Sequence, residues 1–414
     1  MRGKRKYYLK TFTGSKYLFL YNIIEKIFFF FVFLCIARTY SVITYGELIT
    51  AYTFATVLII LFDVGFPVLL QREFAISTNN HSEIFCSLIH LNIIVFFVYF
   101  ILIIIFFLLF YSYISLSLFI LTALLIYLLL ITNLLNAVLL GLNLFKKRFY
   151  FLSLTRVFIL IIFIPMIFVL KVGLNYLFII ISGGIIFQIY LLIFELRKNG
   201  VMFNLPFNFA KILNIVRLSA PLGMAVIFNF LYDKIDIILI SKLTDFSQVS
   251  FYSVGYGIYK SSSFAFSFLL ISGFTRVSYL SRKKYAVKLF FIKYFKLILT
   301  ISIFINVFLF FASDIIISII YSVKYFNSIL ILKILSFAII GLALNNLTGI
   351  ILNALGLFKQ NMFVTLSGLV INIILNIILI PYYGIIAAAL TSILTEYIIL
   401  TGDCFYLNKF LKEK

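Results

Sequence analysis

The stretch IFCSLIHLNIIVFFVYFILIIIFFLLF, residues 84–110, contains no Asp, Glu, Lys or Arg. A bilayer span needs about 20 predominantly apolar residues, so this stretch predicts a transmembrane helix. Eleven further segments share this length and apolar character. The twelve predicted spans are residues 18–37, 48–70, 84–110, 114–140, 153–170, 174–194, 213–240, 249–273, 291–312, 329–353, 361–380 and 384–406.

The basic residues between the spans predict the orientation of the chain. With the N-terminus in the cytoplasm, about 22 of the 34 Lys and Arg residues fall in the two tails and the even-numbered loops. Eight lie inside spans, and only Arg38, Lys171, Lys242 and Lys324 lie in odd-numbered loops. Cytoplasmic loops retain Lys and Arg. We therefore predict a multi-pass membrane protein with an even number of spans and both termini in the cytoplasm.

Composition excludes several function classes. Hydrophobic residues make up 64% of the chain, charged residues 11%, and the mean hydropathy is +1.20. The net charge of +21 lies in short loops, which favours membrane orientation over nucleic-acid binding. His81 and His90 have no partners at metal-ligand spacing, and no phosphate-binding Gly-rich loop is present. We predict no catalytic residues, no metal and no cofactor, hence no enzyme.

The spans divide into two sets of six. We predict an N-terminal bundle over residues 1–195, a cytoplasmic linker over 196–212 and a C-terminal bundle over 213–414. Leu144-Phe145-Lys146 after the fourth span matches Leu357-Phe358-Lys359 after the tenth, which indicates a parallel repeat. Two such bundles around a central cleft are typical of a transporter that works by alternating access.

Charged residues inside the spans are the candidate functional groups, because charge at membrane depth is costly. Lys26 and Lys260 lie deepest, and each either lines a cavity or forms an ion pair between helices. Asp233 and Asp236 are three residues apart and share a helix face, with Lys234 off that face. This pair either binds a cation or proton or pairs with basic groups of the first bundle.

Other charges admit a simpler interpretation. Arg156, Arg217, Lys293, Lys296 and Asp403 lie near the predicted cytoplasmic ends of spans, where side chains can snorkel to water. Asp63 precedes Gly65 and Pro67, which indicate a bend or close helix packing in the second span.

Three stretches carry a resemblance to a known family. The first runs from Ala37-Arg38 through Tyr45-Gly46 and Asp63-Val64-Gly65 to Arg72-Glu73. The second runs from Ala220-Pro221 through Asp233-Lys234-Ile235-Asp236 to Tyr252-Ser253, and the third from Asn345 through Asn372 and Asn376 to Ile380-Pro381 and Tyr383-Gly384. In this order they resemble the polysaccharide (O-antigen-type) flippase family of the multidrug/oligosaccharidyl-lipid/polysaccharide superfamily. The loop at Ser41-Val42-Ile43-Thr44 departs from the family's Gly-Pro turn.

The resemblance implies an all-α membrane transporter with about twelve helices in two six-helix bundles around a central cleft. It implies export of an undecaprenyl-diphosphate-linked oligosaccharide from the inner to the outer leaflet of the bacterial cytoplasmic (inner) membrane. Lys26 and Lys260 would contact the headgroup, and Arg72, Arg156 and Arg217 would attract the diphosphate near the cytoplasmic opening. The candidates for coupling to H⁺ or Na⁺ are Asp63, Asp233, Asp236 and Glu396.

We also predict binding partners for the chain, and two alternative functions stay open. The expected partners are the lipid-linked oligosaccharide, membrane lipids, a coupling ion, and polysaccharide polymerase and chain-length proteins. A cation-coupled multidrug exporter and a lipid II flippase of the same superfamily are the alternative functions. A membrane glycosyltransferase is disfavoured because it would need long outer loops and catalytic carboxylates.

Overall fold

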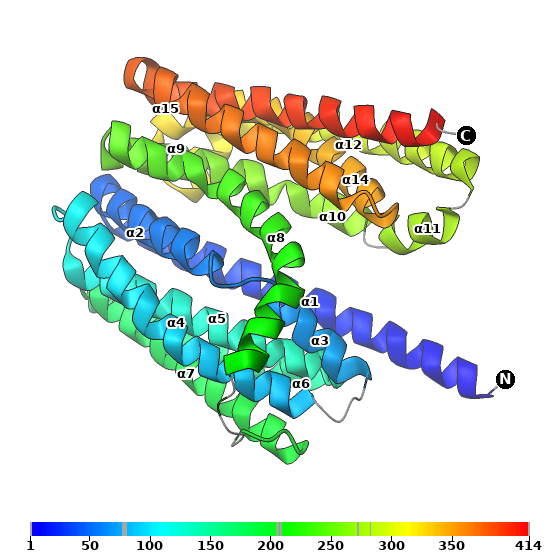
Figure 1. Ribbon diagram of the computed structural model, residues 1–414. Helices are drawn as coiled ribbons and strands as arrows, with labels where there is room; N and C mark the ends of the chain where they lie inside the picture. The colour runs from blue at the N-terminus through cyan, green and yellow to red at the C-terminus, as the bar shows by residue number, and fades with distance from the viewer. Residues whose placement is uncertain are drawn as a thin grey trace. The chain divides into compact units, whose positions relative to one another are not determined.

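The computed structural model describes residues 2–76, 81–203, 207, 209–270, 273–281 and 283–412. These residues form helices joined by short loops, and no strand occurs among them (Figure 1). The predicted all-α architecture is therefore confirmed. The chain forms two compact units, one of residues 1–39 and 51–227 and the other of residues 40–50 and 228–414. The predicted bundle boundaries at residues 195 and 213 stay a prediction.

The first unit consists of the N-terminal helices. They are α1 (Arg2–Thr39), most of α2 (Val42–Ile60), α3 (Phe66–Ile76), α4 (His81–Phe110), α5 (Leu116–Gly141), α6 (Phe145–Phe168), α7 (Leu174–Lys198) and the first part of α8 (Phe209–Leu243). Leu70, Phe74, Phe85, Val138 and Leu192 belong to its buried core, in which α3, α4, α5 and α7 pack together.

The second unit contains the rest of α8 and the helices that follow it. They are α9 (Phe246–Ser261), α10 (Ser263–Leu270), α11 (Gly273–Leu280), α12 (Lys284–Ile320), a 3-10 turn η1 (Val323–Tyr325), α13 (Asn327–Ser336), α14 (Ala338–Ala354) and α15 (Phe358–Lys412). Its core is densely packed because small side chains let helices approach. Ala387, Ala388 and Ala389 of α15 are buried among residues of α9, α13 and α14.

Eight of the helices among the described residues are long and apolar enough to cross a membrane, and a ninth if α13 and α14 form one span bent by 46°. The long helix α15 covers the last two predicted spans. Its backbone turns at Gly384, which has φ 58° and ψ −141°. Large apolar side chains such as Ile101, Leu108 and Leu109 are exposed on α4, as expected for a surface in contact with lipid tails.

The second predicted span, residues 48–70, is interrupted. Helix α2 ends at Ile60 and α3 begins at Phe66, so Asp63 lies in a short non-helical segment. Gly65 has a positive φ of 77°, which costs glycine little, and Pro67 lies in the first turn of α3, where its missing N–H does no harm. The bend that Gly65 and Pro67 predict is thus present.

Gly46 is a point where helix packing in the second unit leaves no room for a side chain. A Cβ atom at this position would overlap the carbonyl oxygen of Phe246, at the start of α9. We expect Gly46→Ala to destabilise the protein by about 2 kcal/mol, because overpacking forces the backbone to shift. Thermal unfolding of the detergent-purified protein measures the effect.

The matched control is Gly257→Ala on α9, because a Cβ atom there meets nothing within 4 Å. This control should retain or slightly raise the melting temperature, since alanine favours a helix over glycine. Equal melting temperatures for the two variants would contradict the close packing at Gly46.

Candidate functional site

Three tyrosines of α9 line one face of the helix in the second unit. Tyr252, Tyr256 and Tyr259 are spaced four and three residues apart, which places them on successive turns. The Tyr252 and Tyr256 rings stack with centroids 5.5 Å apart, and Tyr256 meets Tyr259 edge-on at 5.5 Å. Each hydroxyl donates a hydrogen bond to a different carboxylate. The acceptors are Asp236 at 2.6 Å, Asp233 at 2.8 Å and Glu396 at 3.1 Å, in that order.

Asp233 forms ion pairs with two lysines. The Lys260 ammonium lies 2.6 Å from Asp233 Oδ1, and the Lys234 ammonium lies 3.4 Å from Oδ2. The Lys260 and Lys234 side chains are 31% and 27% exposed. Lys260 also interacts electrostatically with Glu396, so the two lysines serve a cluster of three carboxylates. Lys260 therefore forms the inter-helix ion pair that was one of its two predicted roles.

The structure corrects two expectations about Asp233 and Asp236. One concerns their basic partners, and the other concerns the position of Lys234. The basic partners that Asp233 has among the described residues, Lys234 and Lys260, both belong to the second unit and not to the first bundle. Lys234 is also not remote from the aspartate face, since its long, flexible stem brings its ammonium back to the neighbouring Asp233.

Asp236 is buried in a network of neutral groups. Asn376 of α15 donates to its Oδ1 at 2.7 Å, and Ser392 donates to its Oδ2 at 2.9 Å, beside the bond from Tyr252. Asn376 in turn donates to Asn372 and accepts from Thr391 at 2.6 Å. The carboxylate is thus held by three donors. Within the described ranges no Lys, Arg or His lies at ion-pair distance from it.

Glu396 is the third buried carboxylate, on the second half of α15. Asn345 of α14 donates to its Oε2 at 2.7 Å and also to its backbone carbonyl at 2.8 Å. The approach of α15 to α14 requires a glycine, because a Cβ at Gly341 would lie 2.9 Å from the Glu396 Cβ. Glu396, Asp233 and Asp236 therefore belong to one polar cluster, which joins α8, α9, α14 and α15.

The first unit buries a different charged pair. Arg156 of α6 is only 2% exposed, and its Nη2 donates to Glu25 Oε1 of α1 at 3.2 Å. Its guanidinium also lies 4.8 Å from the centre of the Phe28 ring. The expectation that Arg156 snorkels to water is wrong, because α1 supplies both a counter-charge and an aromatic face at this depth. Nearby on α1, Tyr21 accepts a hydrogen bond from Asn136 and stacks under Arg148.

Asp403 and Lys333 each have a separate hydrogen-bonding partner inside the second unit. Asp403 is 1% exposed and accepts a hydrogen bond from Thr348 at 2.8 Å, so the expectation that it snorkels is wrong as well. Lys333 of α13 donates to Asp314 of α12 at 2.7 Å.

The remaining predicted site residues lie apart from these clusters. Lys26 of α1, Arg72 of α3 and Arg217 of α8 are exposed on their own helices. Asp63 lies between α2 and α3, and its Oδ1 is buried without a hydrogen-bond partner among the described residues. The structure thus gathers Lys260, Asp233, Asp236 and Glu396 in the second unit and places Arg156 in the first.

Sequence reasoning missed the row of tyrosines as a functional feature. The spacing of Tyr252, Tyr256 and Tyr259 was visible and predicts a single helix face. What was not visible is that this face meets three acids that are far apart in the sequence.

Much of this chain matches known protein families in sequence. Residues 12–279, well over half of the chain, match the sequence profile of the family described as polysaccharide biosynthesis protein, and residues 221–378 match that of the MatE family. A stretch of 100 residues, 24% of this chain, is 34% identical to the uncharacterized membrane protein MJ1068 of Methanocaldococcus jannaschii. This match spans only 20% of that relative.

Two solved structures resemble the fold over nearly its whole length. One is a lipid II flippase MurJ in an inward closed conformation, with a TM-score of 0.71 and 18% identity over 97% of this chain and 89% of that chain. The other is an inward-facing multidrug resistance MATE family transporter of the MOP superfamily, with a TM-score of 0.74 and 12% identity over 95% of this chain and 96% of that one. These likenesses confirm the predicted fold class, an all-α membrane transporter fold.

The buried pair of the first unit yields a stability prediction. Glu25→Gln removes the only carboxylate paired with Arg156 among the described residues and leaves a buried guanidinium uncompensated. We expect a loss of about 3 kcal/mol in the free energy of unfolding. Denaturant titration of the detergent-solubilised protein, followed by circular dichroism, measures it.

The control is Lys198→Gln, which removes an exposed charge at the end of α7 and should change stability by less than about 0.5 kcal/mol. The double variant Glu25→Gln/Arg156→Met should recover part of the loss, because it removes the buried charge altogether. A Glu25→Gln protein as stable as the control would contradict the role of the pair.

Proposed function

This chain belongs to the polysaccharide biosynthesis protein family, within the multidrug/oligosaccharidyl-lipid/polysaccharide superfamily of membrane transporters, and on that premise we propose that it is a lipid-linked oligosaccharide flippase. It moves undecaprenyl-diphosphate-linked repeat units from the inner to the outer leaflet of the bacterial cytoplasmic membrane by alternating access. The product serves surface polysaccharide biosynthesis, with O-antigen as the type case of the family resemblance.

The observation that carries this proposal is the pair of lysines at Asp233, in the polar cluster of the second unit. Lys234 and Lys260 share one carboxylate and stay partly exposed, so the group can still attract an anion. A diphosphate offers several oxygens to ammonium donors, and charge-assisted hydrogen bonds of this kind are strong. Lys26, exposed on α1, is the second proposed headgroup contact, and Arg72 and Arg217 are the proposed attracting groups. Arg156 is not proposed for this role, because it is buried and paired with Glu25.

The physics of the substrate explains why a protein is needed. A sugar head cannot enter hydrocarbon without losing hydrogen bonds to water, and each loss costs several kcal/mol. A polar path through the protein removes this barrier while the lipid tail stays in the bilayer. An inside-negative potential also favours outward movement of the anion, by roughly 2.3 kcal/mol per charge per 100 mV.

Among the four candidate carboxylates for ion coupling, we propose Asp236. Asp233 is already paired with two lysines, and Asp63 lies outside the polar cluster of the second unit. Glu396 is buried as well, but it interacts electrostatically with Lys260. Asp236 is buried and held only by neutral donors, so binding of H⁺ or Na⁺ would compensate its charge. Side-chain oxygens, of the kind that bind alkali cations, surround it on Asn372, Asn376, Thr391 and Ser392.

A cation-coupled multidrug exporter is the second candidate function. The MatE match covers residues 221–378, which include two of the three clustered carboxylates and both lysines of the group at Asp233. The two lysines beside Asp233 disfavour a cationic drug at that point. A lipid II flippase shares the diphosphate chemistry, so only the sugar distinguishes it. Polymerase and chain-length partners and cytoplasmic termini also stay predictions.

The first test is translocation of a fluorescent undecaprenyl-diphosphate oligosaccharide in proteoliposomes, read by an external quencher. We expect Lys260→Gln and Lys26→Gln each to lower the rate about tenfold, because each removes one charged contact to the diphosphate. The matched control is Lys293→Gln, which removes an exposed lysine on α12 and should transport normally.

Normal transport in both lysine variants would overturn the headgroup assignment. Failure of the unsubstituted protein to move this lipid, together with efflux of a cationic dye, would favour the exporter. Faster movement of lipid II than of the oligosaccharide substrate would favour the lipid II flippase.

A separate experiment addresses coupling. In proteoliposomes with an imposed Na⁺ or H⁺ gradient, we expect Asp236→Asn to make the transport rate independent of the gradient. The amide has the same shape as the carboxyl group but carries no charge that an ion can balance. Glu47→Gln, a carboxylate on α2 outside the network, is the control and should keep the dependence. Unchanged gradient dependence in Asp236→Asn would exclude this residue as the coupling group.

A further inference from the structure

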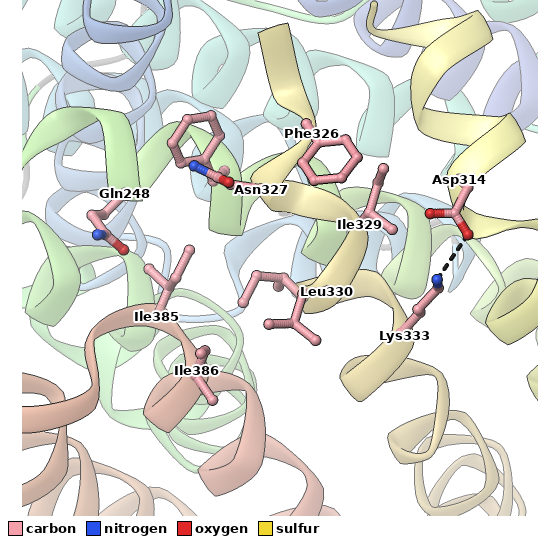
Figure 2. Close-up of a pocket in the computed structure, with 11 residues that line it drawn as sticks. Gln248, Asp314, Phe326, Asn327, Ile329, Leu330, Lys333, Ile385 and Ile386 are labelled. Carbon is pink, nitrogen blue, oxygen red and sulfur yellow. Dashed lines mark hydrogen bonds and ion pairs between the residues drawn. The ribbon is translucent and has the colours of Figure 1, made fainter. Parts of the chain in front are cut away.

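A pocket of about 450 Å³ opens on the second unit, separate from the polar cluster (Figure 2). Apolar side chains form most of its wall, among them Ile329, Leu330 and Ile386. Figure 2 shows the Lys333–Asp314 ion pair at one side and Gln248 at the other, with Leu330 between them. The pocket thus combines an apolar wall with one cation, one anion and amide groups.

The pocket lies near the ends of several helices of the second unit. Gln248 lies in the first turn of α9, and Asn327 is the first residue of α13. Ile385 directly follows the turn at Gly384, and Asp314 lies six residues before the end of α12, which corresponds to about 9 Å along a helix. Four elements therefore begin, turn or end beside the pocket, as transmembrane segments do at the boundary between hydrocarbon and water.

The ion pair retains binding capacity on both partners. Lys333 donates one of its three N–H groups to Asp314 Oδ2 at 2.7 Å, and this bond leaves the second carboxylate oxygen available. The side chains are 30% and 52% exposed, respectively. The remaining hydrogen-bonding positions therefore match a ligand that carries an anionic oxygen and a cationic N–H group a few atoms apart. Leu330 and Phe326 beside them are also exposed, at 49% and 66%, which suits contact with acyl chains.

We propose that this pocket binds a phospholipid with a phosphate and a primary ammonium in its headgroup, which is the chemistry of phosphatidylethanolamine. Lys333 contacts the phosphate and Asp314 accepts from the ammonium, while the glycerol and upper acyl chains lie against Leu330, Ile329 and Ile386. Asp314 disfavours a purely anionic headgroup by repulsion. It also disfavours choline, whose ammonium has no N–H to donate. The orientation predicted from the basic loops places this site in the outer leaflet.

Native mass spectrometry of the detergent-purified full chain tests the proposal. The protein is mixed with equal amounts of phosphatidylethanolamine, phosphatidylcholine and phosphatidylglycerol, and the retained lipid is counted. We expect phosphatidylethanolamine to be retained about threefold over each of the others, the size of effect expected from one exposed charged contact. Lys293→Gln, on α12 outside the pocket, should keep this preference.

Two variants separate the two charged contacts. Lys333→Gln should reduce retention of phosphatidylethanolamine, because the phosphate loses its cation. Asp314→Asn should abolish the preference over phosphatidylglycerol and raise retention of that anionic lipid. A gain of this kind cannot come from misfolding, so the second variant keeps the test decisive.

Three results would overturn the proposal. They are equal retention of all three lipids by the unsubstituted protein, an unchanged preference in Asp314→Asn, and displacement of phosphatidylethanolamine by added undecaprenyl-diphosphate oligosaccharide. The last result would assign the pocket to the transported substrate. The proposal does not depend on the flippase assignment, because lipid retention is measured without transport.

Discussion

A carboxylate inside an apolar helix bundle must be compensated, and this constraint organises the second unit. Burial of an isolated charge costs far more than the few kcal/mol by which a protein is stable, so each acid needs donors or cations close by. Asp233 has two lysines, whereas Asp236 and Glu396 have hydroxyl and amide donors. The donors come from α8, α9, α14 and α15. Compensation of charge therefore holds together helices that apolar contacts alone would leave free to slide.

The tyrosines of α9 connect the three buried acids to one another along one helix face. Each hydroxyl serves one acid, and the rings contact one another along a single helix face. A change at one acid, such as binding of an ion at Asp236, alters the hydrogen bond of Tyr252 and bears on the neighbouring ring of Tyr256. Tyr256 reaches Asp233, where the two lysines gather. The proposed ion-coupling group, Asp236, and the proposed anion-binding lysines at Asp233 are thus connected through two stacked side chains.

The sequence was sufficient for much of this architecture, for identifiable reasons. Apolar length predicts each span independently of the rest of the fold, and Gly65 and Pro67 predict the interruption near Asp63 from local backbone geometry. Charges at membrane depth identified Lys260, Asp233, Asp236 and Glu396 as members of a site. Their partners were beyond reach, because Asp236 meets Asn376 and Ser392 only through tertiary packing. For the same reason Arg156 and Asp403 were expected at the water boundary, whereas packing supplies each with a buried partner.

The two units solve the same problem in different ways, and the difference bears on function. In the first unit the pair of Arg156 and Glu25 is one cation to one anion, backed by the face of Phe28, and such a pair mainly holds α1 against α6. In the second unit two lysines pair with Asp233, while Asp236 and Glu396 have no basic side chain at ion-pair distance among the described residues and are held by hydroxyl and amide donors. The cluster thus contains three carboxylates and two lysines, so part of its buried charge is compensated by neutral donors alone. A buried carboxylate of that kind is the reason that Asp236 is the proposed coupling group, whereas the pair in the first unit is already balanced.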